Sequence, residues 1–473
     1  MRRVSTLLGF ILFAYANAQV PDTAKTLVVG DDNEQEVKQL VVMPDSTIWL
    51  IGTNVAFYKD GYVVIVDSEF NVLLEQSYIL SFRDDEFLTA KAISDTVIII
   101  GGYKTDSASS RDFYVAHIGR SGSVLWEWTW GTTDIDVLND LVIKGVNFIA
   151  VGTSWGGDSG MTDIVVLEAE YPMGGLKWIK QYGGSNLDEG KKVIATASGS
   201  LLIAGNTTSQ GNGAMDILLM KLDSDGNLIW QTTFGYESYD LFSDMTVLPD
   251  GRIALSGHTT SKGNGAFDLW LLLLDSMGIV LMDTTYGGIL ADVPHSMIYD
   301  PLDSAILIVG YTESFSYGTR ELWLLKVNLQ GKVLWQFVMG CIPREEGQDI
   351  VQIGKGRYLV AGYTESWGNA RKNAWLLEIV EKYPESPDSG NTTYSLMPKQ
   401  NPYSLRINKP YIEIDYQSDQ PANALIYTYG GKLLTNKNLR NGKNVILIPE
   451  NQPLILEIKT SNHSQTFKIP AIW

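Results

Sequence analysis

The chain has 473 residues, a formal net charge of −18, one cysteine and 45% hydrophobic residues. So acidic a body repels nucleic acid and anionic membranes, and we expect neither as a partner; a single thiol excludes an intramolecular disulfide. Long runs of Ala, Glu, Lys, Leu and Arg are missing, which excludes a mainly helical protein.

The first twenty residues predict a signal peptide. Two arginines precede the apolar run 7–15, and small residues follow at 16–18. The alternative is a buried helix. We expect residues 1–18 to be removed by cleavage between Ala18 and Gln19, and one cysteine favours export by a bacterium. No later segment reaches the ~20 apolar residues of a transmembrane span.

A unit of 50–53 residues recurs seven times. Each copy has a short apolar run with a glycine, as in "LLIAGNT" and "IALSGHT", and then an acidic or polar residue, a second apolar run and a turn. The seven glycines are Gly52, Gly102, Gly152, Gly205, Gly257, Gly310 and Gly362. Four short strands in about 40–50 residues are typical of a propeller blade. The sequence therefore predicts an all-β fold with a seven-bladed β-propeller over 19–380; the competing interpretation is a parallel β-helix.

The two ends of this array complement each other. The seventh copy stops after its third strand, at "AWLLEIV", and lacks the Trp-to-Tyr-Gly strand of the middle copies. Near the N-terminus, "KTLVVG" at 25–30 occupies the place that "QTTFG" holds in those copies. We therefore expect the N-terminal strand to complete the last blade and close the ring, so that no sheet edge is left unpaired at the seam.

Recurring side chains within the copies have structural interpretations. Tryptophans such as Trp178 and Trp230 recur four positions before an aromatic residue or Met, and we expect them to pack between blades. The glycines indicate close backbone approach or positive φ at strand ends. Acids that open the third strands are expected to accept N–H bonds from the preceding turn. These acids are Asp112, Asp163, Asp216, Asp268 and Glu321.

A second acidic column stands five residues after each Tyr-Gly-type glycine, with Gln35 in the corresponding place of the first copy. Its members are Asp136, Asp188, Asp240, Asp292 and Glu345. Ring symmetry would bring them together around one mouth of the channel. Two interpretations stay open: the acids stabilise turns, or they form a rim that binds a divalent cation or a polar ligand. No other cofactor is expected.

Signatures of catalysis are missing from the sequence. The four histidines share no ligand spacing, and no phosphate loop, nucleophile elbow or calcium loop is present. The hairpins "LDSDGNLIW" and "VNLQGKVLW" resemble the tryptophan-docking repeats of quinone-dependent dehydrogenases and their non-catalytic relatives. This resemblance covers the hairpin alone and supports a propeller.

The C-terminal part has a different composition. Residues 381–393 form a Pro/Ser/Gly/acidic linker, and 394–473 alternate like the strands of a small Ig-like β-sandwich. After the linker there are nine basic and five acidic residues, whereas residues 19–393, which include the linker, have 25 basic and 49 acidic residues. This break in charge also predicts a domain boundary.

This C-terminal domain resembles the type A sorting domain of the type IX secretion system of Bacteroidota. The resemblance covers the last 70 to 80 residues and rests on Tyr427, Gly430, Gly431, Lys432, Gly442, Asn444 and Lys468. The family's Gly-Xaa-Tyr before the penultimate strand is replaced by "QPLILEI". The resemblance implies that the type IX machinery is a partner, and that the protein is secreted or held on the outer surface of a Gram-negative cell.

Three functions follow from the sequence. The first is a non-enzymatic protein whose propeller face binds a protein or glycan. The second is a hydrolase or quinone-type redox enzyme with carboxylates at the channel mouth. A glycosidase would need two carboxyl groups about 5 to 9 Å apart in a pocket. The third is an accessory component of the secretion apparatus.

Overall fold

The computed structural model describes residues 21–381 except 109, 157–160, 173, 317–318, 341–342 and 369–370, and it describes 403–408, 411–416, 422–428, 433–447, 454–460 and 464–469. Contacts divide the chain into two units, Met1–Tyr383 and Pro384–Trp473. Over the described ranges the regular elements are strands, and no helix there is long and apolar enough to cross a membrane. The predicted cleavage site, Ala18 and Gln19, lies outside the described residues.

The first unit contains seven four-stranded antiparallel sheets, which are the blades. Blade 1 consists of β2 (Glu34–Val42), β3 (Ile48–Val55), β4 (Lys59–Val66) and β5 (Val72–Tyr78). Blade 2 consists of β6 (Glu86–Ala92), β7 (Val97–Thr105), β8 (Arg111–Gly119) and β9 (Val124–Trp130). Blade 3 consists of β10 (Asp136–Lys144), β11 (Asn147–Trp155), β12 (Thr162–Glu170) and β13 (Leu176–Tyr182). Blades 4 and 5 consist of β14 (Asp188–Ala195), β15 (Leu201–Thr207), β16 (Asp216–Leu222) and β17 (Leu228–Phe234); and β18 (Asp240–Val247), β19 (Ile253–Thr259), β20 (Asp268–Leu274) and β21 (Val280–Tyr286). Blades 6 and 7 consist of β22 (Asp292–Asp300), β23 (Ala305–Thr312), β24 (Glu321–Asn328) and β25 (Val333–Met339); and β26 (Glu345–Gly354), β27 (Arg357–Thr364), β28 (Asn373–Val380) and β1 (Asp22–Val29).

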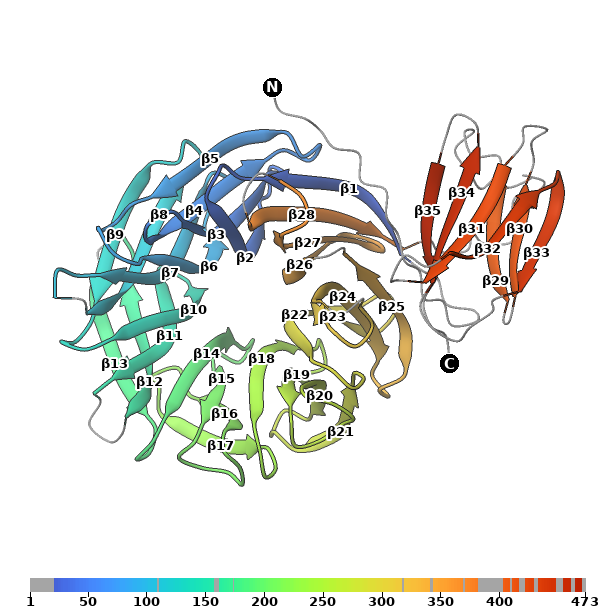
Figure 1. Ribbon diagram of the computed structural model, residues 1–473. Helices are drawn as coiled ribbons and strands as arrows, with labels where there is room; N and C mark the ends of the chain where they lie inside the picture. Colours follow the sequence, from blue (N-terminus) through green and yellow to red (C-terminus); the bar gives the residue numbers. More distant parts are fainter. Residues whose placement is uncertain are drawn as a thin grey trace, which may run out of the picture. The chain divides into compact units, whose positions relative to one another are not determined.

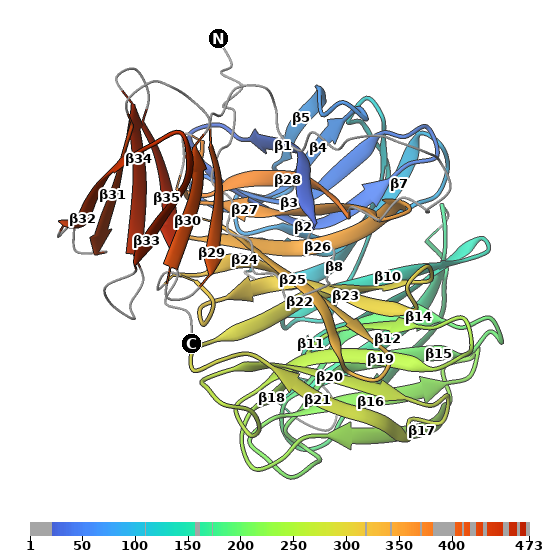
Figure 2. The same ribbon diagram turned by 90° about the vertical axis from the view of Figure 1, so that its right-hand side faces the viewer.

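The seven blades form a closed ring. The first strand of each blade contacts the first strand of the next, and β26 of blade 7 contacts β2 of blade 1. These inner strands surround the centre of the ring, and the fourth strands lie at its periphery (Figures 1 and 2). The prediction of an all-β, seven-bladed propeller is therefore confirmed.

The ring closes through the N-terminal strand. β1 pairs antiparallel with β28, with Val28 opposite Trp375, so the fourth strand of blade 7 precedes blade 1 in the chain. The indole Nε1 of Trp375 donates a hydrogen bond to Thr26 Oγ1 at 3.0 Å. Val29 is 7% exposed and packs in one apolar cluster with Leu376. This is the place that the sequence assigned to residues 25–30.

Burial explains why the apolar runs are continuous instead of alternating. The second and third strands of each blade are covered on both faces by neighbouring blades, so both sets of side chains are apolar. In β20 all seven residues are buried, whereas the peripheral β17 begins with two exposed residues, Leu228 and Ile229. A strand covered on both faces reads as an unbroken apolar run.

The tryptophans of the fourth strands pack between blades, as the sequence predicts. A Cβ on Gly226 would lie 2.8 Å from the ring of Trp178, and one on Gly278 would lie 3.1 Å from the ring of Trp230. Both glycines have positive φ in the outer turn of the following blade. Each indole therefore rests on the turn of the next blade, where the missing side chain leaves room.

The second unit contains two antiparallel sheets. One has the order β29 (Tyr403–Asn408), β30 (Tyr411–Tyr416), β33 (Gly442–Leu447), and the other β32 (Leu433–Leu439), β31 (Ala422–Thr428), β34 (Leu454–Thr460), β35 (Ser464–Ile469). Tyr427 lies in β31, Gly442 and Asn444 in β33, and Lys468 in β35, while Gly430, Gly431 and Lys432 lie outside the described residues. The Asn444 side chain is buried, and its Nδ2 donates to Arg440 O at 2.7 Å. The Ig-like topology and the sorting role stay predictions.

Candidate binding site

The seven repeated glycines allow a β-bulge in every inner strand. In blade 4, Gly205 of β15 pairs with Gly190 of β14, and the register shifts between Gly190 and Lys192. A Cβ on Gly205 would lie 1.8 Å from the carbonyl oxygen of Glu189; at the other six glycines the corresponding distance is 1.9–2.3 Å. The glycines thus serve close backbone approach, as expected, but they lie within the strands and not at their ends: β3 continues three residues beyond Gly52.

Each bulge turns two successive side chains toward the channel axis, because the extra residue breaks the alternation of the strand. The fourteen side chains line one cavity of about 130 Å³. The first residues of the pairs, which we call the cavity ring, are Lys38, Leu88, Asn139, Lys191, Ser243, His295 and Gln348. The second residues, which we call the linking ring, are Gln39, Thr89, Asp140, Lys192, Asp244, Ser296 and Asp349.

The linking ring joins every blade to the next by a hydrogen bond. In blades 1, 3, 5 and 7 its member is an acceptor for a backbone N–H of the next blade: Ala90 N to Gln39 Oε1 (2.6 Å), Val193 N to Asp140 Oδ2 (3.2 Å), Met297 N to Asp244 Oδ2 (2.9 Å) and Leu40 N to Asp349 Oδ2 (2.8 Å). In blades 2, 4 and 6 its member donates to the next aspartate: Thr89 Oγ1 to Asp140 Oδ1 (2.7 Å), Lys192 Nζ to Asp244 Oδ1 (2.9 Å) and Ser296 Oγ to Asp349 Oδ1 (2.8 Å). The belt is therefore continuous around the axis.

The charges of the linking ring are close to balanced. Burial raises the pKa of Asp140, but Lys91, at 3.2 Å, and Lys192 lower it further, so the carboxyl group stays ionised. Burial lowers the pKa of Lys192, and Asp244 and Asp140 outweigh this effect, so its pKa lies above the ordinary value. Burial raises the pKa of Asp349. Two ammonium groups thus neutralise most of the charge of three buried carboxyl groups.

The basic members of the cavity ring are also paired. Lys38 Nζ lies 2.8 Å from Glu36 Oε2, Lys191 Nζ lies 3.2 Å from Glu189 Oε2, and His295 Nε2 lies 3.4 Å from Glu346 Oε2. Although burial raises the pKa of Glu36, Lys38 and Lys372 lower it to about 2. Burial likewise raises the pKa of Glu346, and His295 and Arg320 lower it to about 2. Each basic member of the cavity ring is therefore paired with a glutamate that lies outside the cavity lining.

The residues of the predicted acidic column lie at the starts of the inner strands. All five members, Asp136, Asp188, Asp240, Asp292 and Glu345, are 0% exposed. Asp188 accepts hydrogen bonds from Gly184 N (2.8 Å), Ser209 Oγ (2.6 Å) and Thr207 Oγ1 (2.5 Å). These are the bonds of the turn-stabilising interpretation, and none of the five lines the cavity. A role of the column in binding stays a prediction.

The structure adds a member to this column that the sequence interpretation missed. Asp85 opens blade 2 next to β6, is 0% exposed and accepts from Thr105 N at 2.8 Å. Gln35 is buried in blade 1. The residues that lead to Asp85 read "ILSFRDD" and contain no aromatic-Gly pair, so the pattern that marks the other members of the column is missing at this position. The spacing of about 50 residues between Gln35, Asp85 and Asp136 was the available signal.

Two of the acids that open the third strands, Asp216 and Asp268, cap turns as expected. Asp216 Oδ2 accepts from Asn212 N (2.7 Å) and Gly213 N (3.2 Å), and Asp268 accepts in the same way in blade 5. The glycine that ends the fourth strand lies against this acid: a Cβ on Gly235 would lie 1.6 Å from Asp216 Oδ1. The glycine is required there because a side chain would displace the carboxylate.

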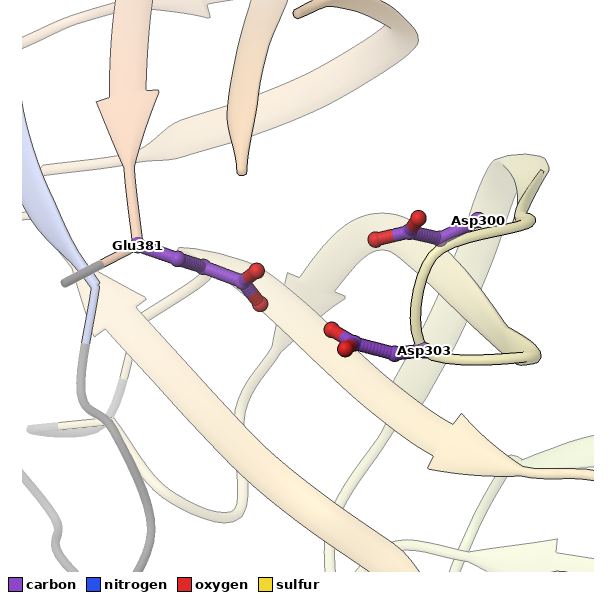
Figure 3. Close-up of side chains that lie close together, drawn as sticks. All are labelled: Asp300, Asp303 and Glu381. Atoms are coloured by element: carbon purple, nitrogen blue, oxygen red, sulfur yellow. The ribbon is translucent and has the colours of Figure 1, made fainter. Parts of the chain in front are cut away.

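A third acidic group surrounds a lysine between blades 6 and 7. Asp300, Asp303 and Glu381 point toward one another (Figure 3), with one oxygen of each within 4.8 Å of the others. Lys326 Nζ, 0% exposed, fills this space and lies 2.8 Å from Asp300, 2.5 Å from Asp303 and 2.8 Å from Glu381. The ammonium group stands where a metal ion would be coordinated, so the cluster is an ion-pair cage.

One face of the propeller carries exposed apolar side chains. We call it the mouth face: it is formed by the starts of the inner strands, the loops between second and third strands, and the connections between blades. At blade 1, Phe57 is 99%, Phe82 88% and Ile79 69% exposed. Their two loops are joined by a hydrogen bond from Asp85 N to Lys59 O (2.7 Å). Contiguous exposed apolar groups mark interaction sites.

Comparisons with known proteins agree with this fold. The family model described as "Domain of unknown function (DUF5122) beta-propeller" matches residues 196–228, which include all of β15 and β16. A search of curated proteins finds no match. The family description supports the propeller and names no activity.

Solved structures similar to the chain are of several kinds. The periplasmic gluconolactonase PpgL of Pseudomonas aeruginosa is 11% identical over 65% of this chain and 86% of its own, with a TM-score of 0.44. The Dos1 propeller is 10% identical over 76% and 95%, with a TM-score of 0.47. A fungal alcohol oxidase of the AA5 family, in complex with copper, is 11% identical over 95% and 99%, with a TM-score of 0.46. At these values the likenesses carry no argument about function.

Proposed function

We propose that this chain is an exported, non-enzymatic binding protein that holds a protein or glycan ligand on the mouth face of its propeller. The observation that carries the proposal is the exposure of Phe57, Tyr58, Ile79 and Phe82 on two loops that are joined by a hydrogen bond. These side chains project from short loops of rigid blades, and a solvent-exposed Phe has no stabilising role in the monomer. Burial of such groups in a complex stabilises it by about 25 cal/mol per Å² of apolar surface.

The channel supports binding over catalysis. The carboxylates on its axis, Asp140, Asp244 and Asp349, each accept hydrogen bonds from the following blade and from a hydroxyl or ammonium group. Their role in joining blades accounts for their presence without a proton-transfer function. The cavity is also smaller than the ~300–1,000 Å³ of sites for drug-sized ligands, so a large ligand would bind over the mouth face.

The route to the cell surface is part of the same proposal. The basic segment ahead of an apolar run, the small residues before Gln19 and the sorting-domain residues Tyr427, Gly442 and Asn444 support export and passage through a type IX-like system. A surface or secreted location suits a protein whose interaction surface is a preformed propeller face. An accessory role in the secretion apparatus is a second form of this binding function.

The test compares ligand capture by the chain and by F57S/F82S. Glycan arrays and outer-membrane extracts supply the ligands, and each captured ligand is measured again by surface plasmon resonance. We expect the variant to weaken binding at least about tenfold, because two buried Phe side chains are worth well over 1.4 kcal/mol. L125S is the matched control: Leu125 is 59% exposed but lies on the peripheral strand β9. Equal binding by parent and F57S/F82S would refute the site.

A further inference from the structure

We infer that the channel cavity binds one neutral sugar residue, either a free monosaccharide or the terminal residue of a glycan. The inference deepens the proposed function, because it names a ligand class for the centre of the mouth face. It rests on three properties of the cavity: charge, hydrogen-bonding capacity and size.

The charges of the wall favour a neutral ligand. Lys38, Lys191 and His295 reach the cavity with side-chain exposures of 28%, 36% and 26%, and each is paired with a glutamate just outside the cavity lining. An anion would have to compete with these carboxylates, and a cation with the bases. A neutral molecule that both donates and accepts hydrogen bonds leaves these ion pairs intact and bonds to the donor and acceptor groups that the pairs do not use.

The uncharged members of the cavity ring suit hydroxyl groups. Asn139 and Gln348 present amides, each with two donor hydrogens and an oxygen acceptor with two lone pairs, and Ser243 presents a hydroxyl group. Asn139 Nδ2 donates to Gly190 O at 2.6 Å and to Thr153 Oγ1 at 3.5 Å. Gln348 Nε2 donates to Glu346 Oε2 at 3.4 Å, and Ser243 Oγ lies 3.3 Å from His258 Nδ1. The amide oxygens of Asn139 and Gln348 are therefore the groups that would accept hydrogen bonds from a ligand. A sugar hydroxyl donates one hydrogen bond and accepts two. Leu88 is the one apolar member and can contact the C–H face of a sugar ring.

The size and rigidity of the cavity point to one small ring. Its volume of about 130 Å³ lies below the ~300–1,000 Å³ of sites for drug-sized ligands, which limits a ligand inside it to one small ring. The linking ring is hydrogen-bonded from blade to blade around the axis, so its side chains are held in place before a ligand binds. Such preorganisation reduces the cost of ordering on binding.

The experiment titrates the full chain with glucose, galactose, mannose and N-acetylglucosamine, and with glucuronate and glucosamine as charged counterparts. Saturation-transfer NMR and calorimetry detect binding. We expect at least one neutral sugar to bind more tightly than its charged counterpart, and N139A/Q348A to weaken that binding about tenfold, because ligand hydrogen bonds are lost. Q231A is the matched control, since Gln231 lies on the peripheral strand β17 and bonds to Gln210. Oligosaccharides that end in the same sugar distinguish a glycan terminus from a free monosaccharide.

Three results would overturn the inference: no neutral sugar binds the parent chain, the charged sugars bind more tightly, or N139A/Q348A binds like the parent. Thermal unfolding of both variants shows that they remain folded. If the sugars fail while F57S/F82S still reduces capture of a ligand, the proposed function of the mouth face stands and the sugar assignment falls. If both fail, both are wrong.

Discussion

Replacing Lys326 by methionine tests the ion-pair cage between blades 6 and 7. Methionine keeps most of the side-chain length but removes the charge, and Asp300, Asp303 and Glu381 then face one another without a counter-ion. Breaking a buried ion pair by removing one partner costs about 3–5 kcal/mol. Tyr358 Oη and Trp335 Nε1 still donate to Asp300 and Glu381, both at 2.5 Å, which places the expected loss near the lower end.

The assay is urea unfolding of K326M and the parent at pH 7.5 and pH 5, followed by tryptophan fluorescence. Without the ammonium group the three carboxylates repel one another in the folded state. Protonation at lower pH relieves this repulsion, so the loss should be smaller at pH 5. The control K177M removes an exposed lysine of β13. A loss below about 1 kcal/mol at pH 7.5 would refute the reasoning, since it falls under the range for a broken buried pair.

Three further predictions concern the ring and its turns. Deleting residues 19–30 removes β1 and exposes β28. The deletion should lower the free energy of unfolding by at least about 3 kcal/mol, because the apolar contacts of Val28 and Val29 are removed. A deletion variant with the parent's melting temperature would contradict closure by β1. G235A should cost more than about 2 kcal/mol, since its Cβ would lie 1.6 Å from Asp216 Oδ1, whereas G175A, whose Cβ meets only Glu170 Oε2 at 3.9 Å, should be close to neutral in the same melting assay. Glu36 and Glu346 have folded-state pKa values of about 2 against 4.5, so their stabilisation is complete above pH 4.5 and is lost as the pH falls toward 2. E346Q should therefore flatten the acid limb of a stability–pH curve, and an unchanged limb would exclude Glu346 as a source of it.

The sequence predicts the fold because several independent features recur in every copy of the repeat. Seven glycines at 50–53-residue intervals, continuous apolar runs and the displaced "KTLVVG" give the blade, its count and its closure. The strand boundaries follow less well, because the strands continue beyond the glycines. The sequence indicated that these glycines allow close backbone approach. It did not indicate the result of that approach, which is a bulge in the opposite strand that forms the channel wall.

The candidate site could not be predicted in the same way. The linking ring has a regular spacing, but its members change in chemistry from blade to blade, from Thr89 to Asp140 to Lys192, so no repeated letter marks it. The acidic column does repeat, and for that reason it drew the binding hypothesis, although its side chains are buried in turns. Side chains that serve one purpose in each blade recur, whereas those that meet at a shared centre must differ in order to complement one another.

Seven is an odd number, and the belt around the axis shows what this implies. Alternating acceptor and donor side chains can close without a fault only over an even count, so two acceptor positions must become neighbours once in each circuit. This happens between Asp349 and Gln39, where the strand that arrives from the far end of the chain completes blade 7. The amide of Gln39 avoids a second carboxylate at that junction. Seven identical copies could not reproduce this alternation, so a design that repeated one copy of this propeller would need a different hydrogen-bond pattern at its centre.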